Sequence, residues 1–320
     1  MAHRSLGPGL DGVLVVAKPA GPTSHDIVAL VRRLAQTKRV GHGGTLDPFA
    51  GGVLPLFLGR ATRLAEFHLG ADKTYRATVC FGASSTTDDL EGELTPADGP
   101  PVERALVDAA LARFRGPIRQ RPPDFSAIKV GGRRAYALAR AGEAVELRER
   151  EVTIHRAEIA SWDGTDAARP IAVIEISCSA GTYVRALARD LGSAVGSAAY
   201  LGALTRTASG PFELDGALTL EALRDAAADG PAGLTRVLRP IDAGLDHVPT
   251  VTVDAAAVAD LAKGRFIKDP GASAPVGGHA GDGLIRVVDA QGRLVALARI
   301  RDGRLAPDKV FVDPQPQPVG

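Results

Sequence analysis

The chain has 320 residues, of which 45% are hydrophobic and 23% charged, and its formal net charge at pH 7 is +1. This is the composition of an ordinary globular protein, with room for one large domain and one small one. The near-zero charge excludes a globally basic protein, so any surface for a nucleic acid must be local.

The cysteines and the N-terminal residues indicate the cellular compartment in which the protein is expected. Cys80 and Cys178 both lie in apolar runs with strand character, which favours buried thiols in a reducing compartment over a disulfide or a zinc site. Two cysteines among scattered histidines argue against a metal cluster. No apolar run is long enough to span a membrane, and residues 1–10 lack the core of a signal peptide. We therefore expect a cytosolic protein.

The first element in chain order is a short buried strand over residues 11–17, whose apolar run is bounded by turn residues. The strand stops at Lys18, in the string Lys-Pro-Ala-Gly-Pro-Thr-Ser. Thr23 or Ser24 can cap the helix that follows. The end of this helix is basic, and its cations either complement the helix dipole or face a phosphate. The sequence leaves both readings open for these residues: Arg32, Arg33, Lys38 and Arg39.

Residues 41–48 read Gly-His-Gly-Gly-Thr-Leu-Asp-Pro. Glycine allows a left-handed backbone and the close approach of another molecule, and Pro48 pushes Asp47 into an extended conformation. The string therefore predicts a tight loop that presents one carboxylate at a set angle. The plain alternative is a glycine-rich connection with a solvated aspartate.

A helix over residues 59–69 and a strand over 72–81 are expected next, because apolar and polar residues alternate along the second segment. Tyr75 on that strand is either a core aromatic or a rigid platform on which a nucleic-acid base stacks. A polar, acidic hairpin loop over residues 84–99 and an amphipathic helix over 101–114 follow.

Residues 113–134 carry a local excess of positive charge, because seven Arg and Lys side chains face the single acid Asp124. Basic residues such as Arg121 and Lys129 are interleaved here with prolines and glycines. This pattern suits a loop that lies along a phosphate backbone, and a plain solvated loop is the alternative. A short helix is expected over residues 134–140.

Strands are expected over residues 151–159 and 171–179, and the second is apolar enough to be central. A glycine corner joins it to a helix, and such corners commonly mount functional side chains, here Tyr183 and Arg185. The alternative for Arg185 is a cation on the helix surface that pairs with Asp190.

The last third of the chain begins with the string Ala-Tyr-Leu-Gly-Ala-Leu-Thr-Arg-Thr over residues 199–207, and helical sequence follows over 213–240. From Val248 a new unit begins, with a strand–turn–strand hairpin over residues 285–298. The Pro/Gln-rich tail from Pro314 is expected to be disordered.

Several of these strings, in this order, resemble motifs of the bacterial TruB-type tRNA pseudouridine synthases. Matches to the family's Gly-His-x-Gly-Thr-Leu-Asp-Pro, Lys-Pro-x-Gly-x-Thr-Ser, Lys-x-Tyr and Gly-Thr-Tyr-x-Arg occur at residues 41–48, 18–24, 73–75 and 181–185. Residues 122–129 are similar to its Pro-Pro-x-Tyr-Ser-Ala-x-Lys segment, with Phe125 in place of Tyr. In the 199–207 string, Tyr200 and Thr205 replace the family's His and first Arg.

The resemblance implies roles for individual residues. Asp47 would be the catalytic carboxylate, Tyr75 would stack under the target base and relay a proton, and Arg185 would pair with Asp47. A neighbouring guanidinium favours an ionised carboxylate, so we expect Arg185 to keep Asp47 charged. The 18–24 string would support the catalytic loop, and Asp89 would have a structural role. The residues expected to bind the substrate are His42, Tyr183, Leu204, Lys18, Lys129 and Arg121.

The implied fold is α+β: a mixed, largely antiparallel sheet flanked by helices, with an inserted segment that grips RNA and a small C-terminal PUA-like β-barrel. The expected domains are a catalytic domain over residues 1–244 with the insertion at 113–142, the PUA-like domain over 245–313, and a tail over 314–320.

The implied activity is conversion of uridine 55 in the T loop of tRNA to pseudouridine, by a cytoplasmic monomer without cofactor, metal, membrane or protein partner. Two alternatives stay open: a guide-RNA-dependent synthase of the archaeal and eukaryotic type, and a non-catalytic tRNA-binding or folding factor. A glycoside hydrolase would need two carboxylates around the bond, and the sequence shows no strong second candidate beside Asp47.

Overall fold

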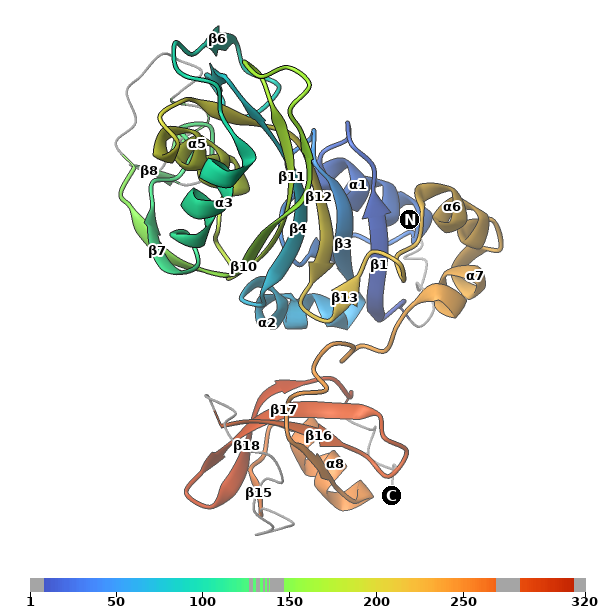
Figure 1. The fold of residues 1–320 in the computed structure, drawn as a ribbon. Helices are drawn as coiled ribbons and strands as arrows, with labels where there is room; N and C mark the ends of the chain where they lie inside the picture. The colour runs from blue at the N-terminus through green and yellow to red at the C-terminus, as the bar shows by residue number, and fades with distance from the viewer. Residues whose placement is uncertain are drawn as a thin grey trace, which may run out of the picture.

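The computed structural model describes residues 9–126, 129–130, 133–134, 136, 138, 147–268 and 283–313. In this part of the chain a nine-stranded sheet and a five-stranded sheet form two units, which Figure 1 shows one above the other. Among the described helices, none is both long and apolar enough to cross a membrane.

The nine-stranded sheet forms the centre of the larger unit. Its main path, in spatial order, is β1 (Gly12–Lys18), β3 (Gly51–Leu58), β12 (Ala199–Ser209), β4 (Lys73–Phe81), β11 (Ile171–Cys178), β10 (Arg150–Asp163) and β7 (Gly116–Gln120). Two short strands extend it, β2 (Val40–His42) on β3 and β13 (Phe212–Glu213) on β12. Two separate ribbons pair β5 (Ala83–Ser85) with β6 (Leu94–Pro96), and β8 (Lys129–Val130) with β9 (Arg133–Arg134).

Helices cover the sheet at both ends, as Figure 1 shows. They are α1 (Ser24–Leu34), the 3₁₀ helix η1 (Gly59–Leu64), α2 (Ala65–Leu69), α3 (Arg104–Ala112), α5 (Val184–Ala194), α6 (Leu220–Ala228) and α7 (Gly230–Val237). Leu111 of α3 and Leu187 of α5 share one core with β4, β10, β11 and β12. Ile27 of α1 packs instead on β1 and β3. Each fully buried side chain of this size contributes about 1.5–3 kcal/mol.

The single parallel pairing described in the large sheet brings β12 beside β3 at only two register positions, Thr205 opposite Gly51 and Arg206 opposite Gly52. Gly52 has a φ of +109°, and a Cβ there would lie 2.2 Å from the carbonyl oxygen of Arg206. Only glycine permits this approach. As a result, residues 204–206 of β12 lie beside the loop that enters β3.

The smaller unit holds the last five strands and one helix. These are β14 (Thr250–Thr252), α8 (Ala255–Ala262), β15 (Ile267–Lys268), β16 (Leu284–Val288), β17 (Leu294–Arg301) and β18 (Arg304–Val310), with strand order β14-β16-β17-β18-β15. Leu64 of η1 packs with Leu297 and Phe311 in a core that joins the two units. Across the same junction, Arg63 donates to the carbonyl of Val310 at 2.6 Å.

The structure confirms the predicted α+β class and the largely antiparallel sheet. The helix expected over residues 59–69 is also confirmed, as the 3₁₀ helix η1 followed directly by α2; in η1 the Thr62 hydroxyl donates to the Gly59 carbonyl three residues earlier. One local prediction was wrong. The basic segment from residue 113 was expected to be a loop but opens with strand β7, because its backbone pairs with β10.

Some predictions remain untested. Most of the helix expected over residues 134–140 and the whole tail from Pro314 lie outside the described residues. The division into domains at residues 244 and 245 stays a prediction.

Candidate active site

The loop that presents Asp47 is held from below by Lys18 and Ser24. Lys18 is 2% exposed, and its ammonium donates to the carbonyls of Ala50 at 2.6 Å and Pro48 at 3.3 Å. The Ser24 hydroxyl accepts from the Leu46 amide at 2.8 Å and donates to the Leu46 carbonyl at 3.0 Å. Thr23, not Ser24, caps α1, so Ser24 is free to hold the loop. The backbone on either side of Asp47 is thereby fixed.

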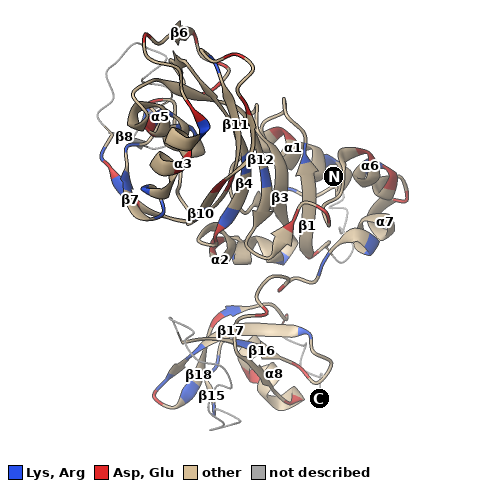
Figure 2. Cartoon of the chain, in the orientation of Figure 1, with Lys and Arg blue, Asp and Glu red and all other residues tan. Residues whose placement is uncertain are grey.

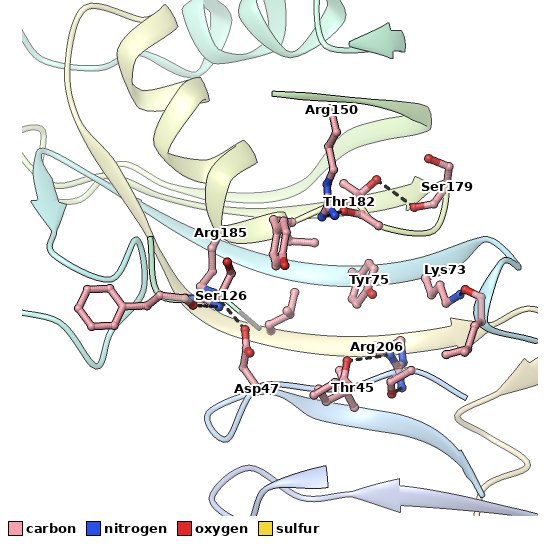
Figure 3. Close-up of a pocket in the computed structure, with 18 of the residues that line it drawn as sticks. Thr45, Asp47, Lys73, Tyr75, Ser126, Arg150, Ser179, Thr182, Arg185 and Arg206 are labelled. Carbon is pink, nitrogen blue, oxygen red and sulfur yellow. Dashed lines mark hydrogen bonds and ion pairs between the residues drawn. The ribbon is translucent and has the colours of Figure 1, made fainter. Parts of the chain in front are cut away.

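A third buried side chain, Arg206 of β12, holds the other end of the loop. Its guanidinium donates to the carbonyls of Gly44 at 3.1 Å, Thr45 at 3.4 Å and Val53 at 2.8 Å. Arg206 is 1% exposed, and it reaches these carbonyls because the parallel pairing places β12 beside β3. Figure 3 shows its contact with Thr45 on the floor of the pocket.

Asp47 and Arg185 form the ion pair that the sequence predicted. Arg185 Nε lies 3.0 Å from Asp47 Oδ2, and the Arg185 side chain is only 7% exposed (Figure 3). The same guanidinium lies 3.2 Å from Asp89 and donates to the carbonyls of Thr87 and Phe125, both at 3.1 Å. One buried cation therefore serves two carboxylates and two carbonyls.

The net effect of this environment is to raise the pKa of Asp47 above its ordinary value. Burial of the carboxylate is the largest cause, and the Asp89 carboxylate adds to it, whereas Arg185 and Lys18 oppose the increase. The sequence prediction named only the attraction of Arg185, which does lower the pKa, and left out the opposing effects of burial and of Asp89. The Asp47 side chain keeps 37% of its surface exposed, because it opens into the pocket.

The pocket is a cavity of about 470 Å³. It brings together five of the predicted site residues from four separate segments: Asp47, Tyr75, Tyr183, Arg185 and Leu204. Because Leu204 lies on β12 and Tyr75 lies on the neighbouring β4, the sheet itself forms one wall. The opposite wall is the start of α5.

Tyr75 lies directly opposite Arg206 in the register of β4 and β12, so the guanidinium acts electrostatically on the phenol. Burial raises the pKa of the Tyr75 hydroxyl, and the Arg206 guanidinium opposes that shift. The phenol is therefore protonated at neutral pH, with a fixed cation beside its oxygen. A phenol in this setting can pass on a proton without leaving a bare negative charge.

Tyr183 is the N-cap residue of α5, and its backbone is held by the side chain of Gln120 at the end of β7. The Tyr183 amide donates to Gln120 Oε1 at 2.8 Å, and Gln120 Nε2 donates to the Tyr183 carbonyl at 3.0 Å. Gln120 is 1% exposed. The Arg150 guanidinium lies 4.4 Å from the centre of the Tyr183 ring, so the ring is covered by a cation on one face.

A lysine that the sequence analysis did not select also lines the pocket. Lys73 is 6% exposed and donates to the carbonyl of Leu69 at 2.7 Å. Burial lowers its pKa to about 8, and the nearby Arg206 contributes to the decrease.

Three predicted substrate-binding residues whose side chains the structure describes, His42, Lys18 and Arg121, do not line the pocket. His42 is half-buried on β2, accepts from the Gly44 amide at 3.3 Å, and has its pKa lowered by burial. Lys18 lies beneath the loop. Arg121 is exposed and pairs with Asp124 at 2.6 Å. Lys129 lies on β8, and its side chain is outside the part that the structure describes.

A second carboxylate, that of Asp89, shares the Arg185 guanidinium with Asp47. Asp89 is 3% exposed and does not line the pocket. Its carboxylate accepts from the Thr87 hydroxyl at 2.5 Å and the Glu91 amide at 3.0 Å. Both groups hold Asp89 in its turn, so it supports Arg185 without facing a substrate.

Sequence reasoning missed Arg206, Gln120 and Lys73, whereas the loop support given by Ser24 agrees with the role predicted for the 18–24 string. A signal existed for Arg206, because it occupies an inward position of a strand, where an apolar residue is the rule. The role of Gln120 depends on a contact with a residue 63 positions away, for which a single sequence carries no pattern.

The chain matches two domains of one protein family. Residues 32–184 match the N-terminal domain of the TruB family of pseudouridylate synthases, and residues 185–246 match the C-terminal domain of tRNA pseudouridylate synthase B. Curated relatives carry the name tRNA pseudouridine synthase B. That of Symbiobacterium thermophilum is 48% identical over 82% of this chain and 85% of its own. That of Thermobifida fusca is 44% identical over 94% of this chain and 98% of its own.

Solved structures with a similar fold share a lower sequence identity with this chain. One is an H/ACA RNP bound to a substrate RNA containing 2'-deoxyuridine, with a TM-score of 0.72, 26% identity and coverage of 95% of this chain and 86% of that chain. Another is a Cbf5-Nop10-Gar1 complex, with a TM-score of 0.71, 27% identity and coverage of 95% and 85%.

Proposed function

Because the chain belongs to the TruB family of pseudouridylate synthases, we propose that it converts uridine 55 in the T loop of tRNA to pseudouridine, without a guide RNA. The observation that carries the proposal is the Asp47–Arg185 pair, which opens into a pocket walled by Tyr75 and Leu204. A uridine turned out of its stem-loop would meet the Asp47 carboxylate there.

The reaction breaks the bond between ribose C1′ and uracil N1, turns the base and joins C1′ to C5. Asp47 acts either as the nucleophile at C1′ or as the base that removes a ribose proton. The proton on C5 must then leave, and N1 must gain one. Tyr75 relays a proton in this step, and Arg206 beside its oxygen stabilises the negative charge that develops there. No bond change requires a redox agent, metal or nucleotide cofactor.

RNA binding would rest on two basic regions outside the pocket. The first is the insertion that starts at β7, and Figure 2 shows Lys and Arg along β7 and β8. The second is one edge of the C-terminal unit, where Lys268 of β15 and Arg301 of β17 both lie opposite Arg304 of β18. No carboxylate among the described residues forms an ion pair with these three cations. Phosphate groups of the tRNA are the natural partners of both regions.

The guide-RNA-dependent alternative is less well supported. The solved H/ACA RNP and Cbf5-Nop10-Gar1 structures are 26% and 27% identical to this chain, whereas relatives named tRNA pseudouridine synthase B are 43–48% identical over most of it. We therefore also propose that the protein acts as a monomer in the cytoplasm, with tRNA as its only macromolecular partner. Gel filtration alone and with tRNA tests the monomer.

The decisive experiment incubates the purified protein with an unmodified T-arm stem-loop and with full tRNA, in the absence of guide RNA. Mass spectrometry after chemical labelling of pseudouridine measures conversion at position 55. We expect full conversion by the wild-type protein and none by Asp47→Asn, which should still bind tRNA within about threefold because the amide preserves shape. Conversion by Asp47→Asn would remove Asp47 from the chemistry. Binding without conversion by the wild-type protein would favour the non-catalytic factor.

A further inference from the structure

Helix α5 carries two arginines one turn apart, Arg185 and Arg189, and both donate to the first residues of the insertion. Arg185 donates to the carbonyl of Phe125 at 3.1 Å, and Arg189 donates to the carbonyl of Arg121 at 2.9 Å. We call residues 120–126 the stalk, because they connect strand β7 to the rest of the insertion. Together with the Gln120 contact to Tyr183, these bonds fasten the stalk along α5.

The same two arginines hold the turn that carries Asp89. Arg185 donates to the carbonyl of Thr87 at 3.1 Å, and Arg189 pairs with the carboxylate of Asp88 at 2.8 Å. Asp88 has a φ of +61°, a left-handed conformation that residues other than glycine seldom adopt. The Arg189 contact fixes the side chain of this residue and so stabilises the turn around it.

Arg189 uses all three of its guanidinium nitrogens. Nε contacts Asp190 at 2.9 Å, and the two terminal nitrogens contact Asp88 and the Arg121 carbonyl. Its side chain is 25% exposed and does not line the pocket. A planar guanidinium can span three separate acceptors in this way, whereas a lysine ammonium on a flexible stem holds them less rigidly.

We propose that Arg189 is a positioning residue for the reaction: by tying the stalk to the 87–89 turn, it fixes the two carbonyls that orient Arg185 toward Asp47. Without Arg189, the Phe125 and Thr87 carbonyls would lose their anchors, and the Arg185 guanidinium would no longer be confined to one position beside the carboxylate. The stalk also belongs to the segment proposed to grip RNA, so the same residue links RNA contact to the catalytic pair. This inference rests on the proposed synthase activity.

The test compares Arg189→Lys and Asp88→Asn with the wild-type protein on unmodified tRNA, with kcat, KM and the Kd for tRNA measured separately. We expect each variant to lower kcat at least about tenfold, because small displacements of a catalytic group are costly, and to change Kd by less than about threefold. The double variant should lose no more than the worse single one, since both changes break the same contact. Arg104→Lys, in an exposed Arg104–Asp108 pair on α3, is the matched control and should change neither constant.

A second readout separates positioning from general loss of structure. Arg185, Lys18 and Asp89 are the charged groups that act on Asp47, and Arg185 is the strongest of those that lower its pKa. A loosened Arg185 should therefore move the acid limb of the kcat/KM profile to higher pH in Arg189→Lys. A fold that is merely less stable would leave the limb in place and lower only the active fraction, as thermal unfolding would show.

The inference is overturned if the wild-type protein converts uridine 55 and Arg189→Lys does so at the same kcat, or with an unmoved acid limb. It is also overturned if the variant loses tRNA affinity in proportion to its loss of rate. An inactive wild-type protein would instead contradict the proposed function itself.

Discussion

The catalytic loop and the proposed RNA-binding surfaces use positive charge in opposite ways. Around Asp47, the cations Lys18, Arg185 and Arg206 are buried and aimed at carbonyls or carboxylates of this chain. On the insertion, Arg121 is about half exposed and pairs with its neighbour Asp124. Buried cations hold one geometry, whereas exposed pairs are weak and can exchange a carboxylate for a phosphate. The burial of a cation therefore separates arginines that hold the shape of the site from arginines that can bind RNA phosphates.

The largest expected effect is on kcat, when the proton relay through Tyr75 is removed. Tyr75→Phe keeps the ring for stacking but removes the hydroxyl whose pKa the Arg206 guanidinium lowers. We expect kcat to fall about 10²–10⁴-fold, the usual contribution of a positioned acid or base, while the Kd for tRNA stays nearly constant. Single-turnover kinetics measure both. A full rate in Tyr75→Phe would show that the ring alone is sufficient.

The second prediction concerns the free energy of unfolding, which should depend on pH through the buried side chain of His68. His68 is 4% exposed between the rings of Phe57 and Phe212, and burial lowers its pKa to about 4 from 6.5. The unfolded chain therefore takes up a proton first, so stability is full above pH 6.5 and is lost as pH falls toward 4. The loss amounts to about 3 kcal/mol.

Urea unfolding at pH 7 and pH 4 measures this loss. In His68→Gln the loss between the two pH values should shrink by most of that amount. The matched control is His155→Gln, at an exposed histidine that pairs with Asp72, and it should leave most of the pH dependence in place. An unchanged slope in His68→Gln would assign the acid sensitivity to other groups.

A third change breaks one of the loop's anchors. Lys18→Met keeps the length of the side chain but leaves the Pro48 and Ala50 carbonyls without their donor. Each unsatisfied buried group costs about 1–3 kcal/mol, so with two carbonyls we expect the free energy of unfolding to fall by about 2–6 kcal/mol and kcat to fall with it. Denaturant unfolding and turnover are the measurements, and Lys263→Met, at an exposed lysine, is the control. A full kcat in Lys18→Met would mean that the loop keeps its shape unaided.

The smallest effect should be on tRNA affinity, when one exposed cation of the proposed RNA-binding surface is removed. Arg304→Gln removes one cation from the edge of the C-terminal unit without disturbing a described ion pair. We expect full tRNA to bind only a few-fold more weakly, with a salt slope smaller by about 1, and kcat at saturation to be unchanged. Filter binding over a range of salt concentrations measures the slope. An unchanged slope would place Arg304 outside the RNA contact.

The parts of the site that could be predicted are those whose residues stand close together in sequence. Asp47 follows from the 41–48 loop, and its pairing with Arg185 follows from the resemblance of residues 181–185 to a family motif. Individual strands were predictable because strand periodicity is a local property, whereas the mixed sheet was implied by the family resemblance. The prediction for Lys18 was divided, since it was assigned both to loop support and to substrate contact, and the structure places it under the loop.

What could not be predicted depends on residues that meet only after folding. Gln120 contacts Tyr183 across 63 positions, and Arg206 contacts the Gly44 carbonyl across 162. The net direction of the Asp47 pKa is of the same kind, because it sums burial, Asp89 and Arg185. The pKa of Asp47 is a sum of opposing contributions, and a sequence motif names only one of them, the attraction of Arg185.

The contact between Gly52 and the backbone of Arg206 makes one position vulnerable although it bears no reactive group. A methyl group there would wedge the two strands apart, carry Arg206 away from Tyr75 and release the Thr45 carbonyl in a single step. A random screen for inactive variants should therefore recover changes at Gly52 as readily as changes at Asp47, and their cause would be invisible to any inspection limited to chemically active side chains.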